Sequence, residues 1–193
     1  MIKAIVFDCF GVLVGQGYQN TYRRAGGDPI KDKKFIDEMM QKANLGLISA
    51  DHFSSSVASR LNLTLQEYRE IIKNAEQINQ PIFDLIVSNL KASYKIGLLS
   101  NANKGVVERK IPKDLLQLFD IIVISGEVGF VKPDPKIFKL SADELGIELE
   151  EMVFIDDLSV YVNSAKELGI NTIHYTGFDN FKQELKKILS KDF

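Results

Sequence analysis

Cysteine and histidine are scarce in this chain of 193 residues, which contains one Cys and two His. A single cysteine cannot close a disulfide within the chain, and this suits a reducing compartment. His52 and His174 lie far apart in the sequence, so the usual nitrogen and sulfur ligand sets for zinc or iron are not expected. Any bound metal should therefore have mainly oxygen ligands, which favours a hard cation such as Mg²⁺.

Long apolar runs and a strong charge imbalance are also missing. The longest apolar runs are far too short to span a bilayer, and the first residues lack the pattern of a secretory signal. A net charge of -2 gives no reason to expect a nucleic acid or an anionic membrane as a partner. With 45% hydrophobic and 26% charged residues, the composition is that of a soluble globular protein. We therefore expect a cytoplasmic protein with one domain, or one domain with a modest insertion.

Apolar runs alternate with helical patterns along most of the chain. The helical pattern at residues 135–145 is closed by Gly146, and a final amphipathic helix begins near Phe178. Strands that alternate with helices predict an α/β fold, here a Rossmann-like parallel sheet with helices on both faces. Short apolar runs predict five strands, at residues 5–7, 95–99, 121–124, 152–155 and 171–174.

Residues between about 18 and 78 interrupt this alternation, because they show helical patterns only. Thr64 stands three residues before Glu67, which predicts a capping box at the start of one of these helices. The glycines of Gly15-Gln16-Gly17 offer a hinge before the block. A packing layer with no part in function is the alternative to a functional insertion. We expect a main domain at residues 1–14 and 80–193 with a helical insertion at residues 15–79.

Polar residues follow the predicted strands at four places. Asp8 follows the first strand, Ser100-Asn101 the second and Asp156-Asp157 the fourth, while Lys132 lies in the loop after the third. In a parallel sheet these ends share one edge, where α/β proteins bind ligands. Neighbouring carboxylates repel one another unless a cation lies among them, and a lysine and a hydroxyl beside them suit a phosphoryl group. Taken singly, Lys132 could be a solvated loop residue and Asp157 a helix N-cap.

These segments resemble the motifs of the haloacid dehalogenase (HAD) superfamily, whose members are mostly phosphohydrolases. The order and spacing of the motifs agree along the chain, and the helical insertion stands where one subgroup of the family has its cap domain. The resemblance implies a hydrolase with a HAD-like core and an α-helical cap. It is carried by Phe7-Asp8-Cys9-Phe10-Gly11-Val12-Leu13, Leu99-Ser100-Asn101, Glu127-Val128-Gly129-Phe130-Val131-Lys132-Pro133-Asp134-Pro135 and Phe154-Ile155-Asp156-Asp157.

The resemblance also implies a role for individual residues. The implied substrate is a small phosphorylated metabolite, and the implied cofactor is Mg²⁺. The expected catalytic residues are Asp8 as the nucleophile, Ser100 and Lys132. The expected phosphate-binding residues are Phe10 and Gly11 through their backbone amides, Ser100, Asn101 and Lys132. The expected Mg²⁺ ligands are Asp8, Asp156, Asp157 and the backbone carbonyl of Phe10.

Phe10 departs from the family pattern, which usually has a second Asp at this position. That Asp protonates the leaving oxygen and later activates water, and general acid–base catalysis of this kind contributes about 10²–10⁴-fold. A phenylalanine can do neither. Tyr161 is a second departure, because relatives often have Asn or Asp there, and we expect this to loosen the outer shell of the metal.

Three hypotheses are compatible with these departures. The first is a Mg²⁺-dependent phosphatase that is slow or acts on a substrate with a good leaving group. The second is a metal-independent 2-haloacid dehalogenase-like hydrolase, since members with that activity also lack the second Asp. The third is a metabolite-binding or interaction module with little catalysis. We favour the first, because a metal-free site gains nothing from Asp156-Asp157. Polar candidates for substrate recognition in the cap are Tyr18, Tyr22, Arg23 and Arg24.

Overall fold

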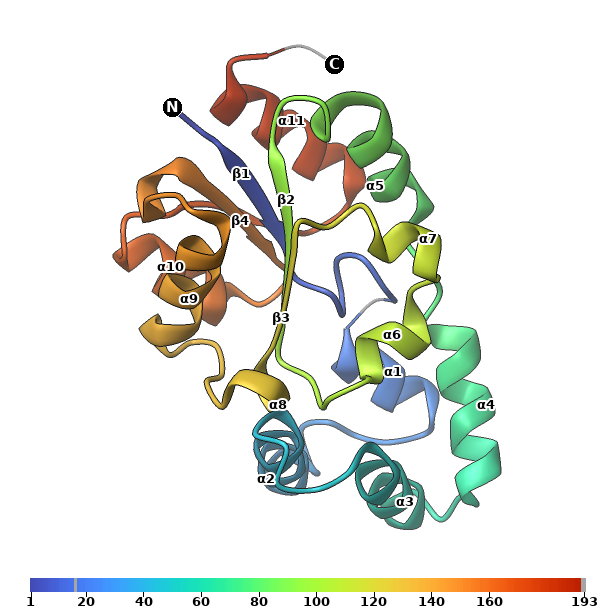
Figure 1. Ribbon diagram of the computed structural model, residues 1–193. Coiled ribbons are helices and arrows are strands. Elements are labelled where there is room, and N and C mark those ends of the chain that lie inside the picture. Colours follow the sequence, from blue (N-terminus) through green and yellow to red (C-terminus); the bar gives the residue numbers. More distant parts are fainter. Residues whose placement is uncertain (16, 192–193) are drawn as a thin grey trace.

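The computed structural model describes residues 1–15 and 17–191, and its centre is a five-stranded sheet (Figure 1). All neighbouring strands are parallel, in the order β3-β2-β1-β4-β5. The predicted Rossmann-like α/β fold is therefore confirmed. The strands are β1 (Ala4–Phe7), β2 (Lys95–Ser100), β3 (Ile121–Ile124), β4 (Met152–Asp156) and β5 (Asn171–His174).

Strand β1 is apolar throughout because both of its faces are covered. Ile5 and Phe7 point into one apolar layer, whereas Ala4 and Val6 point into the other, and none of the four is exposed. Phe7 pairs with Ile155 of β4. Asp8 and Asp156, the residues that follow this pair, therefore lie side by side at the same edge of the sheet.

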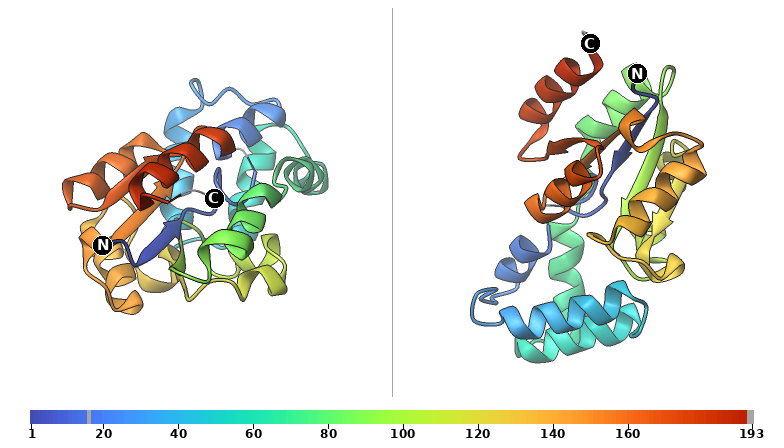
Figure 2. Two further views of the ribbon diagram at one scale, coloured as in Figure 1. Left: turned by 90° about the horizontal axis from the view of Figure 1, so that it is seen from above. Right: turned by 90° about the vertical axis from the view of Figure 1, so that its left-hand side faces the viewer.

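Helices cover both faces of the sheet, as Figure 2 shows. One face packs against α5 (Gln80–Leu85), the π-helical segment η1 (Ile86–Leu90) and α11 (Phe178–Leu189). The other packs against α9 (Pro135–Leu145) and α10 (Ser159–Glu167). Short helical segments complete the connections: α6 (Val106–Lys110), α7 (Lys113–Leu116), α8 (Ser125–Val128) and η2 (Leu149–Glu151).

Four helices lie between β1 and α5 in the chain and form a separate layer at the lower end of Figure 1. Their apolar side chains make a cluster of their own, centred on Tyr22, Val57 and Tyr68. The predicted capping box is confirmed, since Glu67 N–H donates to the Thr64 hydroxyl and the Glu67 carboxylate accepts from Thr64 N–H. The helices are α1 (Tyr18–Arg24), α2 (Lys33–Asn44), α3 (Ala50–Arg60) and α4 (Leu65–Ala75).

The glycines of the expected hinge both have positive φ, +67° at Gly15 and +81° at Gly17. Gln16, the middle residue of that hinge, lies outside the described residues. No helix in the described parts of the chain combines the length and the apolar character needed to cross a membrane.

Candidate active site

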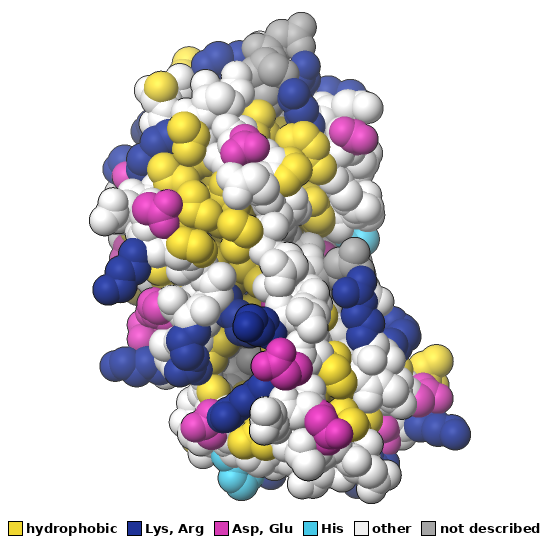
Figure 3. Space-filling view, turned by 90° about the vertical axis from the view of Figure 1, so that its right-hand side faces the viewer, with side chains coloured by type: hydrophobic (Ala, Val, Ile, Leu, Met, Phe, Trp, Pro, Cys, Tyr) yellow, Lys and Arg dark blue, Asp and Glu magenta, His cyan; other side chains and the backbone are white. Residues whose placement is uncertain are grey.

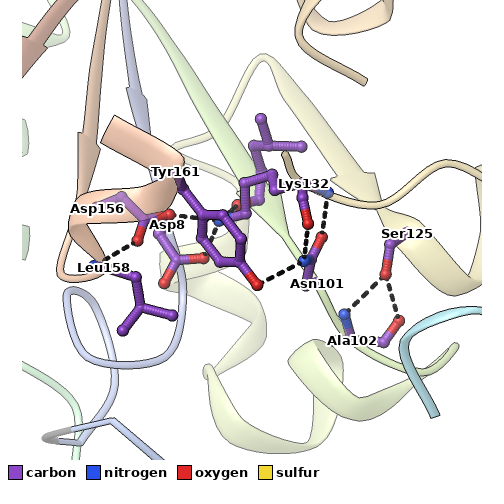
Figure 4. Close-up of polar contacts among 9 residues, drawn as sticks. Asp8, Asn101, Ala102, Ser125, Lys132, Asp156, Leu158 and Tyr161 are labelled. Carbon is purple, nitrogen blue, oxygen red and sulfur yellow. Dashed lines mark hydrogen bonds and ion pairs between the residues drawn. The ribbon is translucent and has the colours of Figure 1, made fainter. Parts of the chain in front are cut away.

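Asp8 and Asp156 meet at the edge of the sheet with the ammonium group of Lys132 between them (Figure 4). Lys132 Nζ lies 2.6 Å from Asp8 Oδ1 and 2.6 Å from Asp156 Oδ2. It also donates to the carbonyl oxygen of Leu99 at 3.2 Å. Lys132 is only 2% exposed, so its interpretation as a solvated loop lysine is wrong. A buried ammonium is stable here because carboxylates and a carbonyl take its hydrogens.

Asp157 completes a group of three carboxylates. Asp8, Asp156 and Asp157 each offer a ligand oxygen, and these oxygens lie within 4.8 Å of one another. Gly11 and Gly17 border Asp157. A Cβ atom at Gly11 would stand 2.3 Å from Asp157 Oδ2, and one at Gly17 would stand 2.8 Å from it. Both glycines have positive φ as well, so the chain approaches this carboxylate where no other residue would fit.

The alternative in which Asp157 serves only as an N-cap is wrong. The residue at the N-cap of α10 is Leu158, and the helix has no side-chain hydrogen bond at its N-cap. The Leu158 N–H donates instead to Asp156 Oδ1, at 2.8 Å. Asp156 therefore uses one oxygen for this amide and the other for Lys132, whereas the carboxylate of Asp157 remains available to a ligand.

The charges of this group favour an additional cation. Burial raises the pKa of Asp8 to about 8, against the opposing effect of Lys132 and with a further contribution from Asp156. Burial and the charge of Asp156 raise the pKa of Asp157 to about 6. For Lys132, burial acts to lower the pKa, but Asp156 and Asp8 outweigh it and keep the amine protonated. Three carboxylates with one ammonium fit a hard divalent cation, which takes oxygen ligands.

Ser100 and Asn101 end β2 beside this group. The Ser100 hydroxyl is fully buried, and within residues 1–15 and 17–191 it has no hydrogen-bond partner. Asn101 has two bonds with the backbone of Lys132: its Oδ1 accepts from the Lys132 N–H at 2.8 Å, and its Nδ2 donates to the Lys132 carbonyl at 2.9 Å. Asn101 thus ties the lysine loop to the end of β2, while Ser100 keeps an unused donor.

Ser125 supports the segment after Ser100 from the side of β3. Its Oγ accepts from the Ala102 N–H at 3.0 Å and donates to the carbonyl of Asn44, the last residue of α2, at 2.6 Å. The bond to Asn44 joins the helical layer to the loop after Ser100, and Figure 4 shows Ser125 bonded to Ala102 of that loop. Ser125 is not among the predicted site residues, and its only signal in the sequence is its place in the Ser125-Gly126 pair after the third strand.

The side chain of Phe10 packs against the main apolar core, so this position supplies no acid or base. The amide of Gly11 donates to the carbonyl of Val14 at 2.8 Å. It is therefore already used within the loop, whereas the amides of Cys9 and Phe10 have no backbone acceptor among the described residues and can be offered to an anion.

The polar residues at the start of the helical layer differ in their surroundings. Tyr22 is buried, and its hydroxyl donates to Asp32 at 2.7 Å, so it holds the layer together. Arg23 and Arg24 are exposed. The ring of Tyr18 packs against Tyr22 and Phe53, and its hydroxyl oxygen is buried without a hydrogen-bond partner in the described parts of the chain.

Comparisons with known proteins agree with this geometry. Residues 2–169 match the family model described as haloacid dehalogenase-like hydrolase. The chain is 29% identical over 206 residues to D-ribitol-5-phosphate phosphatase from Bacteroides thetaiotaomicron, covering 98% of this chain and 100% of that protein. It is 25% identical over 215 residues to bifunctional epoxide hydrolase 2 from Sus scrofa, but that match spans only 39% of the relative's length.

A solved structure is similar over nearly the whole chain. It is a HAD family enzyme from Bacteroides thetaiotaomicron in complex with magnesium and inorganic phosphate, with a TM-score of 0.70 and 26% identity over 90% of this chain and 93% of that one. The family model covers most of the sequence, including the ends of β1, β2 and β4 and the loop that carries Lys132. This protein belongs to the haloacid dehalogenase-like hydrolase family.

Proposed function

We propose that this protein is a Mg²⁺-dependent phosphatase that acts on a small phosphorylated metabolite. The observation that carries the proposal is the buried Asp8–Lys132–Asp156 group, with Asp157 close enough to share a cation. The relative named for D-ribitol 5-phosphate and the neighbour solved with magnesium and inorganic phosphate support the same chemistry.

Asp8 is the proposed nucleophile. One of its oxygens forms a bond to phosphorus as the bond between phosphorus and the leaving oxygen breaks, which gives an aspartyl-phosphate. Water then attacks phosphorus, the bond to Asp8 breaks, and inorganic phosphate leaves. Lys132 holds Asp8 Oδ1 and offsets negative charge on the phosphoryl oxygens. The buried Ser100 hydroxyl, which has no partner within the described residues, donates to one of those oxygens.

Asp8, Asp156, Asp157 and the backbone carbonyl of Phe10 are the proposed ligands of Mg²⁺. When bound, the ion neutralises the carboxylates and polarises the phosphoryl group. The residues present fit such an ion, because their carboxylate oxygens converge and their repulsion is not fully balanced by Lys132.

Phe10 sets the expected speed of the reaction. Without a general acid, the leaving oxygen must take its proton from water, and the missing factor of about 10²–10⁴ corresponds to roughly 3–5.5 kcal/mol of barrier. Turnover should therefore be slow for alkyl phosphates and faster for substrates whose leaving group needs little protonation.

Residues 15–79 are the proposed cap, and residues 1–14 and 80–193 the proposed core. The four helices of the insertion have an apolar cluster of their own, which supports a separate unit. They meet the core through the bond from Ser125 to Asn44, through Gly17 beside Asp157, and through the ion pair of Glu76 with Lys110 at 2.7 Å. Basic and acidic side chains gather around this junction on the face shown in Figure 3. A cap in this position would close over the substrate.

The experiment is a phosphate-release screen over sugar, polyol and nucleoside phosphates, run with Mg²⁺ and with a chelator. We expect Mg²⁺-dependent release that Asp8→Asn abolishes. Release at the wild-type rate by that variant would show that the nucleophile is misassigned. Phosphate binding without turnover would favour the metabolite-binding alternative instead. Halide release from a short 2-haloacid in the presence of chelator would favour the dehalogenase-like alternative.

A further inference from the structure

Tyr161 of α10 stands over the polar group described above. The centre of its ring lies 5.1 Å from Lys132 Nζ, the same atom that contacts Asp8 and Asp156. In Figure 4 the ring extends from α10 across the site toward Asn101. The Tyr161 hydroxyl therefore lies beside the lysine and beside Asn101, the residue that follows β2.

The direction of the hydrogen bonds around Asn101 is fixed by the backbone. Its Oδ1 faces an N–H group, that of Lys132, and its Nδ2 faces a carbonyl, also of Lys132. Rotating the amide by half a turn would place two donors together and two acceptors together, which neither bond allows. The second hydrogen of Nδ2 must therefore donate to the oxygen of Tyr161, at 3.2 Å.

The Tyr161 hydroxyl is thus an acceptor toward Asn101 and keeps its own hydrogen. In the described parts of the chain, the Tyr161 hydroxyl donates no hydrogen bond of its own. Because a hydroxyl rotates, this hydrogen can be given to a group that enters the site beside Lys132. A remaining donor suits an anion and not a cation, which distinguishes Tyr161 from a residue of the metal's outer shell.

We propose that the Tyr161 hydroxyl is a further substrate-binding group, which donates a hydrogen bond to a non-bridging oxygen of the phosphoryl group that Asp8 attacks. This rests on the proposed phosphatase function. With the Ser100 hydroxyl and the Lys132 ammonium, Tyr161 makes a third side-chain donor on the phosphoryl group.

Tyr161→Phe tests the proposal, because it keeps the ring over Lys132 and removes only the hydroxyl. Orthovanadate and inorganic phosphate serve as probes of anion binding in the presence of Mg²⁺, and p-nitrophenyl phosphate serves as a substrate with a good leaving group. A hydrogen bond to a charged group justifies an expected loss of roughly 10- to 100-fold in vanadate affinity and in kcat/KM.

Tyr175→Phe is the matched control. The Tyr175 hydroxyl also accepts from an amide, Asn79 Nδ2 at 2.7 Å, but its ring packs against Phe181 in the apolar core. This variant should bind vanadate within about twofold of the wild type, well below the loss expected for a charged hydrogen bond. Equal losses of vanadate affinity in both variants would mean that removing a tyrosine hydroxyl weakens binding by disturbing the fold. That result would overturn the proposal.

Three further outcomes are decisive. Vanadate affinity that is unchanged in a folded Tyr161→Phe protein would refute the role of Tyr161 and leave the phosphatase proposal standing. Failure of the wild type to bind vanadate or phosphate would overturn both. If Tyr161→Phe does not fold, 3-fluorotyrosine at position 161 decides, since a more acidic phenol is a stronger donor and should tighten vanadate binding. Weaker or unchanged binding by that protein would count against the proposal.

Discussion

Removing the Ser100 hydroxyl should make the protein more stable and less able to bind phosphate. The Oγ atom is fully buried and has no partner within the described residues, and a buried polar group of this kind costs about 1–3 kcal/mol. Ser100→Ala removes that penalty and leaves a void the size of one oxygen atom, worth about 0.3 kcal/mol at ~24 cal/mol per Å³. The free energy of unfolding should therefore rise by about 1 kcal/mol or more, which corresponds to roughly 2–4 °C in Tm per kcal/mol for a chain of this length.

Ser125→Ala is the control for this experiment. Ser125 is as fully buried as Ser100, but its hydroxyl accepts from Ala102 and donates to Asn44. The same substitution here leaves two backbone groups without a partner, so it should lower the free energy of unfolding by about 1–3 kcal/mol. The measurement is urea denaturation of both variants and the wild type without phosphate.

The functional half of the prediction uses vanadate with Mg²⁺. A ligand that binds only the folded state raises Tm by an amount that depends on its affinity, so the shift should be smaller for Ser100→Ala than for the wild type. A Ser100→Ala protein that is less stable than the wild type would refute the reasoning, because it would show that the hydroxyl has a partner in solution. An unchanged vanadate shift would refute its role in binding.

Two further predictions concern Phe10 and Asp120. Phe10→Asp should raise kcat on alkyl phosphates, by up to about 10²–10⁴-fold if the new carboxyl acts as general acid; a folded variant with unchanged kcat would mean that Asp8 is not a working nucleophile. Although partial burial acts to raise the pKa of Asp120, its bonds from Lys91 and the Ile96 amide, both at 2.7 Å, lower it. Its contribution to stability is therefore complete above its unfolded pKa of about 3.9 and is lost as the pH falls through the folded value. Asp120→Asn should destabilise most at pH 7 and least below pH 4, and urea denaturation across this range measures the difference.

The sheet and the meeting of its polar ends could be predicted because they depend on local patterns. An apolar run such as Ile5 to Phe7 is required wherever helices cover both faces of a strand. Once the strands are parallel, their carboxyl ends share an edge, so Asp8 and Asp156 must lie on the same edge, and the pairing of β1 with β4 makes them neighbours. The residues that interrupt the apolar runs were therefore the ones that identified the site.

The finer arrangement could not be predicted because it depends on contacts between distant segments. Ser125 bonds to Asn44, 81 residues away, and nothing in the sequence near either residue indicates the pairing. Lys132 can be buried because its ammonium pairs with Asp8 and Asp156, which lie at the ends of β1 and β4. The helix α10 begins at Ser159, with Leu158 as its N-cap, because the Leu158 amide reaches the carboxylate of Asp156.

The Ser125 hydroxyl has one hydrogen but two carbonyl oxygens within reach, that of Asn44 at 2.6 Å and that of Ala102 at 3.3 Å. If α2 moved away from the sheet, rotation about the Cβ–Oγ bond would redirect this hydrogen to the Ala102 carbonyl. No donor would then be left without an acceptor, and the bond to Asn44 would re-form on return of α2. A single serine hydroxyl would thus lower the cost of separating α2 from the loop after β2, while the bond it accepts from the Ala102 N–H stays in place.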